Sequence, residues 1–174
     1  SVECGECFGL LGPNGAGKTT FSRQHLVALG AGYTFLNADE LARSLSANEM
    51  NQTERDLRAA RLMLQRMDEL SRARTRFIVE TTLSALTYLR KIDEWKGAGF
   101  RVTLIYLRLP SVENAIERVK RRVSLGGHNI PEPTIRRRFG LSLENLEKLY
   151  KPAADTWYVY DSLDGRYSLA ETSQ

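Results

Sequence analysis

The sequence predicts an α/β fold in which a mainly parallel sheet lies between two layers of helices. Short apolar runs typical of buried strands alternate along the chain with longer segments of helical periodicity. A glycine-rich turn joins the first apolar run to the first helical segment. The longest apolar run, residues 101–109, is nearly continuous from Val102 to Leu109, which is typical of a central strand covered on both faces.

Size and composition indicate one domain over residues 1–174. The chain is 42% hydrophobic and 26% charged, which provides a real core and excludes disorder. No apolar stretch reaches the roughly 20 residues that span a bilayer, and the N-terminus lacks a signal-peptide pattern. We therefore expect a cytoplasmic protein without membrane contact.

The first half of the chain begins with an expected buried strand at residues 7–11. A helix over residues 18–29 follows the glycine-rich turn, and a second short strand covers residues 33–37. Asp39 and Glu40 open the next helix, so the order is strand, acid, helix. The inward positions of the first helix are expected to be Phe21, Leu26 and Leu29.

A longer helix is expected after Asn51, which is a favourable N-cap. Its apolar residues recur at steps of three and four and predict the buried face: Leu57, Ala60, Leu64, Met67 and Leu70. Its arginines fall on other faces and are expected to be solvated: Arg55, Arg58, Arg61 and Arg66.

The second half repeats the alternation. A strand over residues 76–80 ends in an acid, a helix covers 85–96, and the apolar strand at 101–109 follows. Ser111 is expected to cap a helix that runs to about Val123.

Glycine and proline residues then mark the last expected boundaries. Gly126 and Gly127 break the preceding helix, and a further helix to about Tyr150 begins after Pro131 and Pro133. Residues 157–160 form a last strand, with residues 167–169 as its expected partner.

The glycine-rich turn within residues 8–20 carries the strongest functional signal. It has the spacing G-x-x-x-x-G-K-[ST], in which backbone N–H groups cradle phosphates, Lys18 neutralises their charge and the Thr19 hydroxyl binds Mg²⁺. A chance glycine-rich turn is disfavoured because a strand precedes it and a helix follows. The motif predicts binding of ATP or GTP through Gly12, Asn14, Gly15, Ala16, Gly17, Lys18, Thr19 and Thr20.

Two acids and a threonine are the next candidates. Asp39 follows the second strand at the carboxyl end of the sheet, where ligands bind, and it could accept the proton of an attacking hydroxyl. The alternative is that Asp39 only caps its helix. Glu80 could bind a Mg²⁺-bound water or a substrate hydroxyl, Thr82 could contact substrate, and local capping is the alternative for both.

A cluster of arginines flanks residues 126–129 and predicts a mobile helical lid over about residues 118–138. The guanidinium fork suits phosphate oxygens as charge develops during transfer. Arg118 and one of Arg136 to Arg138 are the preferred contacts, and His128 is a weaker candidate. The lid candidates are Arg122, His128, Arg136 and Arg137.

The chain resembles the zeta-toxin family of P-loop kinases, especially its short members. The resemblance covers residues 8–161 and rests on the stretches GPNGAGKTTF, FLNADELAR, FIVETTLS and ERVKRRVSLGGHNIPEPTIRRRF. It implies a doubly wound kinase-type sheet and transfer of phosphate from ATP to the sugar 3′-hydroxyl of UDP-N-acetylglucosamine. An antitoxin protein would be the implied partner.

The same resemblance implies a role for each matching residue. Lys18 and Thr19 would hold ATP and Mg²⁺, Asp39 would be the base, and Arg118 would contact the triphosphate. Glu80 and Thr82 would lie near the acceptor. Where the larger toxins carry a second triphosphate-binding arginine in the lid, the nearest match here is His128, and this chain lacks room for their additional elements.

The sequence also allows other functions. Residues 5–20 also resemble the opening of an ABC-transporter ATPase, but no LSGGQ-like signature or strand ending in Asp-Glu follows. The net charge of +4 would suit a polynucleotide kinase or a DNA-binding ATPase. The basic run lacks interleaved aromatic residues, which favours small phosphorylated substrates over nucleic acid.

The C-x-x-C formed by Cys4 and Cys7 could be redox-active or half of a zinc site. Zinc would need two more ligands, and His25 and His128 do not have a paired ligand spacing. We therefore expect reduced thiols.

Overall fold

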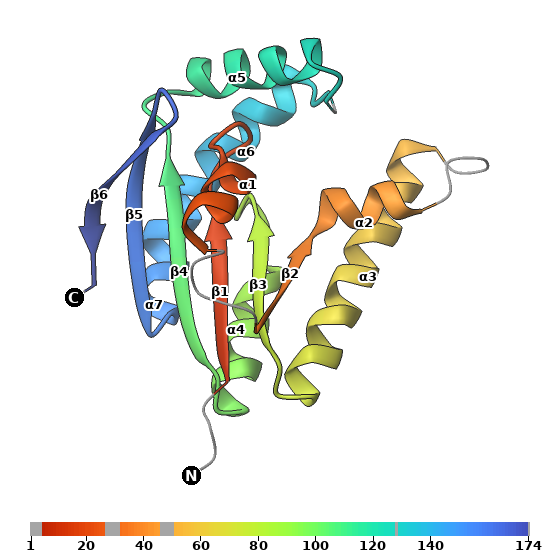
Figure 1. The fold of residues 1–174 in the computed structure, drawn as a ribbon, viewed down its shortest axis with the longest axis vertical. Coiled ribbons are helices and arrows are strands. Elements are labelled where there is room, and N and C mark those ends of the chain that lie inside the picture. The colour runs from red at the N-terminus through yellow and green to blue at the C-terminus, as the bar shows by residue number, and fades with distance from the viewer. Residues whose placement is uncertain (1–4, 27–31, 46–50, 128, 174) are drawn as a thin grey trace.

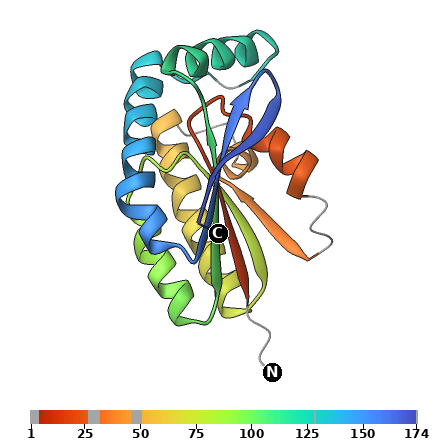
Figure 2. The same ribbon diagram turned by 90° about the vertical axis from the view of Figure 1, so that its left-hand side faces the viewer.

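The computed structural model describes residues 5–26, 32–45, 51–127 and 129–173, except for the side chains of Asp39, Arg43 and Gln52. The chain forms a six-stranded sheet with helices on both faces (Figures 1 and 2). The strands are β1 (Glu6–Leu11), β2 (Tyr33–Asn37), β3 (Arg76–Thr81), β4 (Arg101–Arg108), β5 (Thr156–Leu163) and β6 (Arg166–Thr172).

The strand order is β2-β3-β1-β4-β5-β6, and every pairing is parallel except that of β6 with β5. From β1 the chain passes first to β2 and β3 on one side of that strand and then to β4 and β5 on its other side. The sheet is therefore doubly wound, and ligands are expected at the carboxyl end of β1. The predicted α/β class is confirmed, as is the central place of the strand at 101–109.

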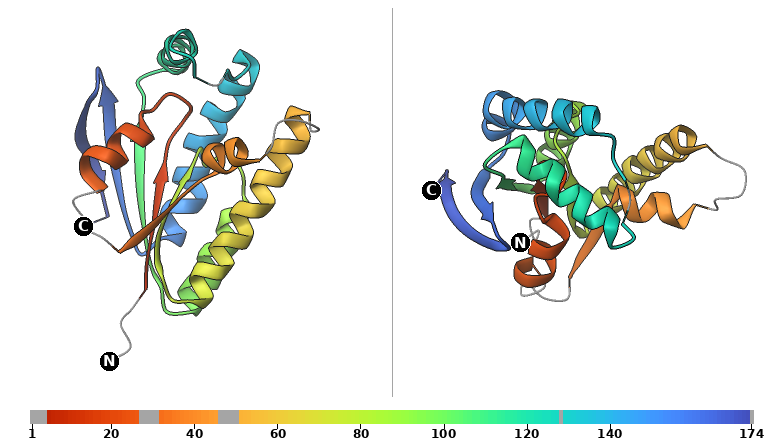
Figure 3. Two further views of the ribbon diagram at one scale, coloured as in Figure 1. Left: turned by 45° about the vertical axis from the view of Figure 1, so that its right-hand side comes forward. Right: turned by 90° about the horizontal axis from the view of Figure 1, so that it is seen from above.

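The helices follow the predicted order, with ends that differ by a few residues. They are α1 (Lys18–Phe21), which continues as the π-helical turn η1 (Ser22–Leu26), α2 (Ala38–Ser44), α3 (Gln52–Arg72), α4 (Thr87–Gly97), α5 (Val112–Ser124), α6 (Glu132–Asn145), the π-helical turn η3 (Leu146–Tyr150) and α7 (Lys151–Ala153). Figure 3 shows α5 lying across the carboxyl end of the sheet.

Two of the predicted N-caps are confirmed. The Asn51 side chain accepts a hydrogen bond from the Glu54 N–H, and Glu54 binds back to the Asn51 N–H, which is a capping box. The Ser111 hydroxyl accepts from the Asn114 N–H at the start of α5.

Each face of the sheet carries its own apolar cluster. One cluster packs the sheet against α3, α4 and η3 and includes Met63, Met67 and Trp95. The other packs it against α1, α5 and the start of α6 and includes Phe21 and Ile116. The described helices contain none long and apolar enough to cross a membrane.

The predicted buried face of α3 is wrong in its first half. Leu57 is 57% exposed and Ala60 is exposed, while the buried stripe is Ala59, Met63 and Met67. Figure 1 shows the reason, because the first half of α3 extends with α2 beyond the sheet. Three of its four arginines are exposed as expected, but Arg55 is half-buried and its Nε is inaccessible to solvent.

Candidate active site

The turn between β1 and α1, residues 12–19, is called the P-loop below. Three of its glycines have positive φ, with values of 143° at Gly12, 80° at Gly15 and 87° at Gly17. A Cβ on Gly12 would lie 2.6 Å from the Leu107 carbonyl oxygen, which any side chain there would strike. Gly12 thus lets the backbone turn sharply against β4.

Lys18 is 8% exposed, and its Nζ donates to the carbonyl oxygens of Gly12 at 2.9 Å and Pro13 at 3.2 Å. Asn14 is 9% exposed, and its buried Oδ1 has no hydrogen-bond partner among the described residues. Buried polar atoms rarely lack a partner, so this carboxamide suits a loop that receives a polar ligand. Thr20 is exposed at the third position of α1.

Side chains from three neighbouring segments meet beside the P-loop. Thr19 Oγ1 donates to Glu80 Oε2 at 3.3 Å, and Asn37 Nδ2 donates to the same oxygen at 3.0 Å. Asn37 ends β2 and pairs in register with Glu80 on β3. One carboxylate therefore connects the nucleotide motif to the end of β2.

Asn37 was missed by the sequence analysis. It is 7% exposed at the end of a strand whose other residues are Tyr33, Thr34, Phe35 and Leu36. A polar residue at the carboxyl end of a parallel strand is the signal that could have identified it.

The other predicted substrate residues follow the same strand ends. Asp39 is the second residue of α2, two positions after Asn37, and its side chain lies outside the described part of the structure. Thr82 Oγ1 and Ser84 Oγ share a hydrogen bond of 3.0 Å. The roles of Asp39 and Thr82 stay predictions.

Within the predicted lid, Arg118 lies against the P-loop. Its guanidinium donates to the Gly15 carbonyl oxygen at 3.4 Å, to Ser162 Oγ at 3.1 Å and to the Ser162 carbonyl oxygen at 3.2 Å. The structure therefore brings Arg118 to the motif, and its role as a clamp on the triphosphate stays a prediction.

The remaining lid candidates differ in their surroundings. Arg136 forms ion pairs with Glu113 at 3.0 Å and Glu132 at 2.8 Å, which raise its pKa and join α6 to α5. Arg137 is exposed, and Arg122 is half-buried with an inaccessible Nε. His128 lies outside the described residues.

Only one cysteine of the C-x-x-C motif lies in the described part of the chain. Cys4 lies outside it, and Cys7 is 1% exposed in the core, where burial raises the pKa of its thiol. A buried neutral thiol is unreactive. The same residues contain no group of three or more His, Cys, Asp or Glu side chains that could hold a metal ion.

The oxygens of Thr19 and Glu80 nevertheless fit Mg²⁺. This ion retains several waters and takes only one or two protein oxygens when it is also bound to phosphates. The pair would hold it directly through the Thr19 hydroxyl and through water at the carboxylate.

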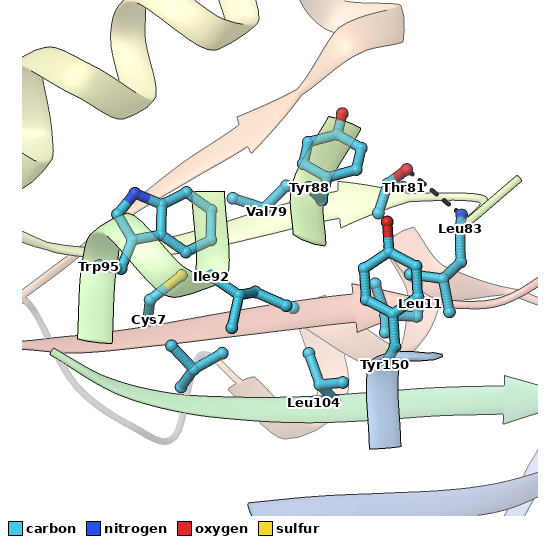
Figure 4. Close-up of a pocket in the computed structure, with 12 residues that line it drawn as sticks. Cys7, Leu11, Val79, Thr81, Leu83, Tyr88, Ile92, Trp95, Leu104 and Tyr150 are labelled. Carbon is cyan, nitrogen blue, oxygen red and sulfur yellow. Dashed lines mark hydrogen bonds between the residues drawn. The ribbon is translucent and has the colours of Figure 1, made fainter. Parts of the chain in front are cut away.

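Figure 4 shows an apolar cavity of about 20 Å³ between the sheet, α4 and η3. It is lined by side chains such as Val79, Ile92 and Trp95. It is too small for a substrate and is best described as a packing gap.

Residues 8–141 match the AAA domain family over most of the chain. The chain belongs to that family. An uncharacterised protein of Haemophilus influenzae is 29% identical over 128 residues, which are 74% of this chain and 88% of that protein.

Two solved structures show the same P-loop kinase fold. One is a chain of the AvrRxo1-ORF1:-ORF2 complex with ATP, with a TM-score of 0.74, 19% identity and coverage of 98% of this chain and 59% of that one. The other belongs to the PezAT chromosomal toxin-antitoxin system of Streptococcus pneumoniae, with a TM-score of 0.69, 18% identity and coverage of 99% and 72%. This chain thus spans about three-fifths of the first of these relatives.

Proposed function

We propose that this protein is an ATP-dependent phosphotransferase of zeta-toxin type, which moves the γ-phosphoryl group of ATP to a hydroxyl of a small acceptor. A nucleotide sugar such as UDP-N-acetylglucosamine is the favoured acceptor. The observation that carries the proposal is the chain of contacts from Thr19 through Glu80 to Asn37, two residues before Asp39. These contacts join a triphosphate-binding motif to Glu80 and to the end of β2, directly before the segment that carries the predicted base.

In this proposal the P-loop N–H groups and Lys18 bind the triphosphate of ATP, or of GTP. Mg²⁺, held beside Thr19 and Glu80, supplies neutralisation of the phosphate charge when bound. Asp39 accepts the hydroxyl proton of the acceptor. The acceptor oxygen then bonds to the γ-phosphorus while the bond from that phosphorus to the β–γ bridging oxygen breaks, and the nucleoside diphosphate leaves.

The remaining predicted residues have supporting roles. Glu80 and Thr82 orient the acceptor, and Arg118 neutralises charge on the triphosphate. The lid candidates Arg122, His128, Arg136 and Arg137 contact phosphate oxygens on closure.

A nucleic-acid acceptor is the second candidate, as in a polynucleotide 5′-kinase. The observation in its favour is the exposure of Arg121 on α5 and Arg137 on α6. Both acceptors require the same P-loop and base. A direct comparison of phosphate transfer to the two kinds of acceptor therefore decides between them. We also propose a protein antitoxin as a partner, because the similar PezAT structure is that of a toxin-antitoxin system.

The test is phosphate transfer from γ-labelled ATP to two panels, one of nucleotide sugars and one of 5′-hydroxyl oligonucleotides. We expect label on a nucleotide sugar and none on the oligonucleotides. A Lys18→Ala variant is the matched control for contaminating kinases. Label on the oligonucleotides alone would favour the second candidate, and ATP binding without any transfer would contradict the phosphotransferase proposal.

A further inference from the structure

Three consecutive carbonyl oxygens of the P-loop each accept a hydrogen bond from a side chain, and the three side chains come from different elements. Arg118 of α5 donates to Gly15 O at 3.4 Å, Ser162 Oγ of β5 donates to Ala16 O at 2.9 Å, and Tyr167 Oη of β6 donates to Gly17 O at 3.0 Å. Ser162 and Tyr167 lie beyond residue 141, where the match to the family ends. Figure 2 shows the β5–β6 hairpin beside this loop.

The direction of these carbonyls determines the direction of the N–H groups that follow them. In a planar trans peptide, the C=O of one residue points opposite to the N–H of the next. Ala16 O is bound by Ser162 of the hairpin, and Gly17 O is bound by both Tyr167 Oη and the Phe21 N–H of α1. The N–H groups of Gly17 and Lys18 therefore point away from these donors. Those N–H groups belong to the glycine-lysine step that cradles phosphate in this motif.

Ser162 is well placed for this role. It is 1% exposed, and its hydroxyl both donates to Ala16 O and accepts from Arg118 NH1 at 3.1 Å. One buried hydroxyl therefore joins the P-loop to the first residue of the predicted lid. A buried hydrogen bond of this kind has no water to replace it when it is removed.

Tyr167 contacts the P-loop and the helix that follows. Its ring packs edge-on against Phe21 of α1 with 5.0 Å between centroids, and a Cβ on Gly17 would lie 2.6 Å from its hydroxyl. Partial burial raises the pKa of Tyr167, so its hydroxyl remains a donor at neutral pH.

We propose that Ser162 and Tyr167 are positioning residues, which hold the P-loop peptide units with their N–H groups directed at the phosphates of the nucleotide. Arg118 joins α5 to the same set of bonds. The inference rests on the proposed function only in taking a nucleoside triphosphate as the ligand. Its central claim, that the hairpin orients the loop backbone, can be measured without any acceptor.

The alternative is that both residues only stabilise the hairpin. Tyr160 provides a matched control, because it lies on β5 and its ring also packs against Phe21, at 5.3 Å. Among the described residues, no hydrogen bond joins its hydroxyl to the P-loop. Tyr160→Phe thus removes a hydroxyl from the same hairpin and the same aromatic cluster.

The experiment uses the full chain and three test variants: Tyr167→Phe, Ser162→Ala and the double variant that combines these two changes. Each is compared with the control variant Tyr160→Phe. Hydrogen–deuterium exchange over residues 12–19 is measured without nucleotide, and the Kd for ATP with Mg²⁺ is measured by calorimetry. We expect faster exchange of the loop and about a 2- to 10-fold weaker Kd for each single variant, the range of one hydrogen bond. Tyr160→Phe should change neither quantity.

Steady-state kinetics and the melting temperature distinguish a positioning role of these residues from a loss of folded protein. Tyr167→Phe should raise the KM for ATP more than it lowers kcat, with a melting temperature equal to that of Tyr160→Phe. Unchanged loop exchange and Kd in both single variants would overturn the inference, even if the double variant fails to fold. If the wild-type protein binds ATP but transfers no phosphate, the proposed function fails while the exchange and affinity results still decide the inference.

Discussion

Two neighbouring turns at the carboxyl end of the sheet are held by similar hydrogen bonds but differ in what they present. One leaves its backbone accessible to a ligand, and the other buries a side chain in the core. The P-loop follows β1, and residues 82–86 follow the adjacent parallel strand β3. In both turns, side chains from the last third of the chain bind backbone carbonyls. Asn145 Nδ2 donates to Leu83 O at 2.9 Å, and Tyr150 Oη donates to Ala85 O at 2.6 Å.

The residue at positive φ distinguishes the two turns. In the P-loop these residues are glycines, which leave the backbone accessible. In the second turn the residue is Leu83, with φ of 60°, whose side chain is 1% exposed in the core. Burial of that side chain offsets the backbone strain. The same kind of anchoring thus serves ligand binding in one turn and packing in the other.

The largest expected effect is that of Lys18→Ala. We expect loss of both ATP binding and phosphate transfer, because the ammonium group is the main positive charge within the P-loop. Calorimetry with ATP checks the binding, and circular dichroism checks that the domain folds. ATP affinity equal to wild type would show that this turn does not bind nucleotide through Lys18.

Asp39→Asn comes next and tests the acceptor side of the site. If Asp39 is the base, turnover should fall by roughly 10²- to 10⁴-fold with ATP binding and the fold retained. If Asp39 only caps α2, Asn should replace it at a cost of about a few tenths of a kcal/mol. The rate of phosphate transfer to the identified acceptor distinguishes the two roles, and thermal melting is the control for folding. Near-normal turnover would remove Asp39 from the mechanism.

In the second turn, Asn145→Ala should act on stability alone. It leaves the buried carbonyl of Leu83 without its donor, and we expect the free energy of unfolding to fall by about 1–3 kcal/mol. Urea denaturation measures this change. The Kd for ATP should match that of wild type at a temperature where both proteins are folded, and a weakened Kd would contradict the division of roles between the two turns.

The smallest effect is expected for Tyr150→Phe, which removes only the hydroxyl that binds Ala85 O. The free energy of unfolding should fall by about 0.5–1.5 kcal/mol. Tyr160→Phe is again the matched control, and a larger change in ATP affinity than in stability would show that the second turn also serves nucleotide binding.

Local sequence was enough to predict the parts of the site that depend on short spacing. The P-loop and the strand-end position of Glu80 follow from apolar runs and motif spacing. Ser162, Tyr167 and Asn145 could not be predicted, because their roles depend on distant segments that meet only in the folded chain. The face of α3 was predicted wrongly at Leu57, because periodicity does not show that the sheet ends before the helix does.

The hydrogen bond from Tyr167 to Gly17 spans 150 residues, so the phosphate-binding motif appears early in synthesis but gains this contact late. Contacts between distant positions form slowly, because a long loop of chain must close first. A nascent chain that has reached only α6 carries the complete motif without the strands that orient it. Nucleotide binding would then reach its full affinity only after residue 167 has been made and β6 has paired, so the site is completed when the sheet is nearly finished.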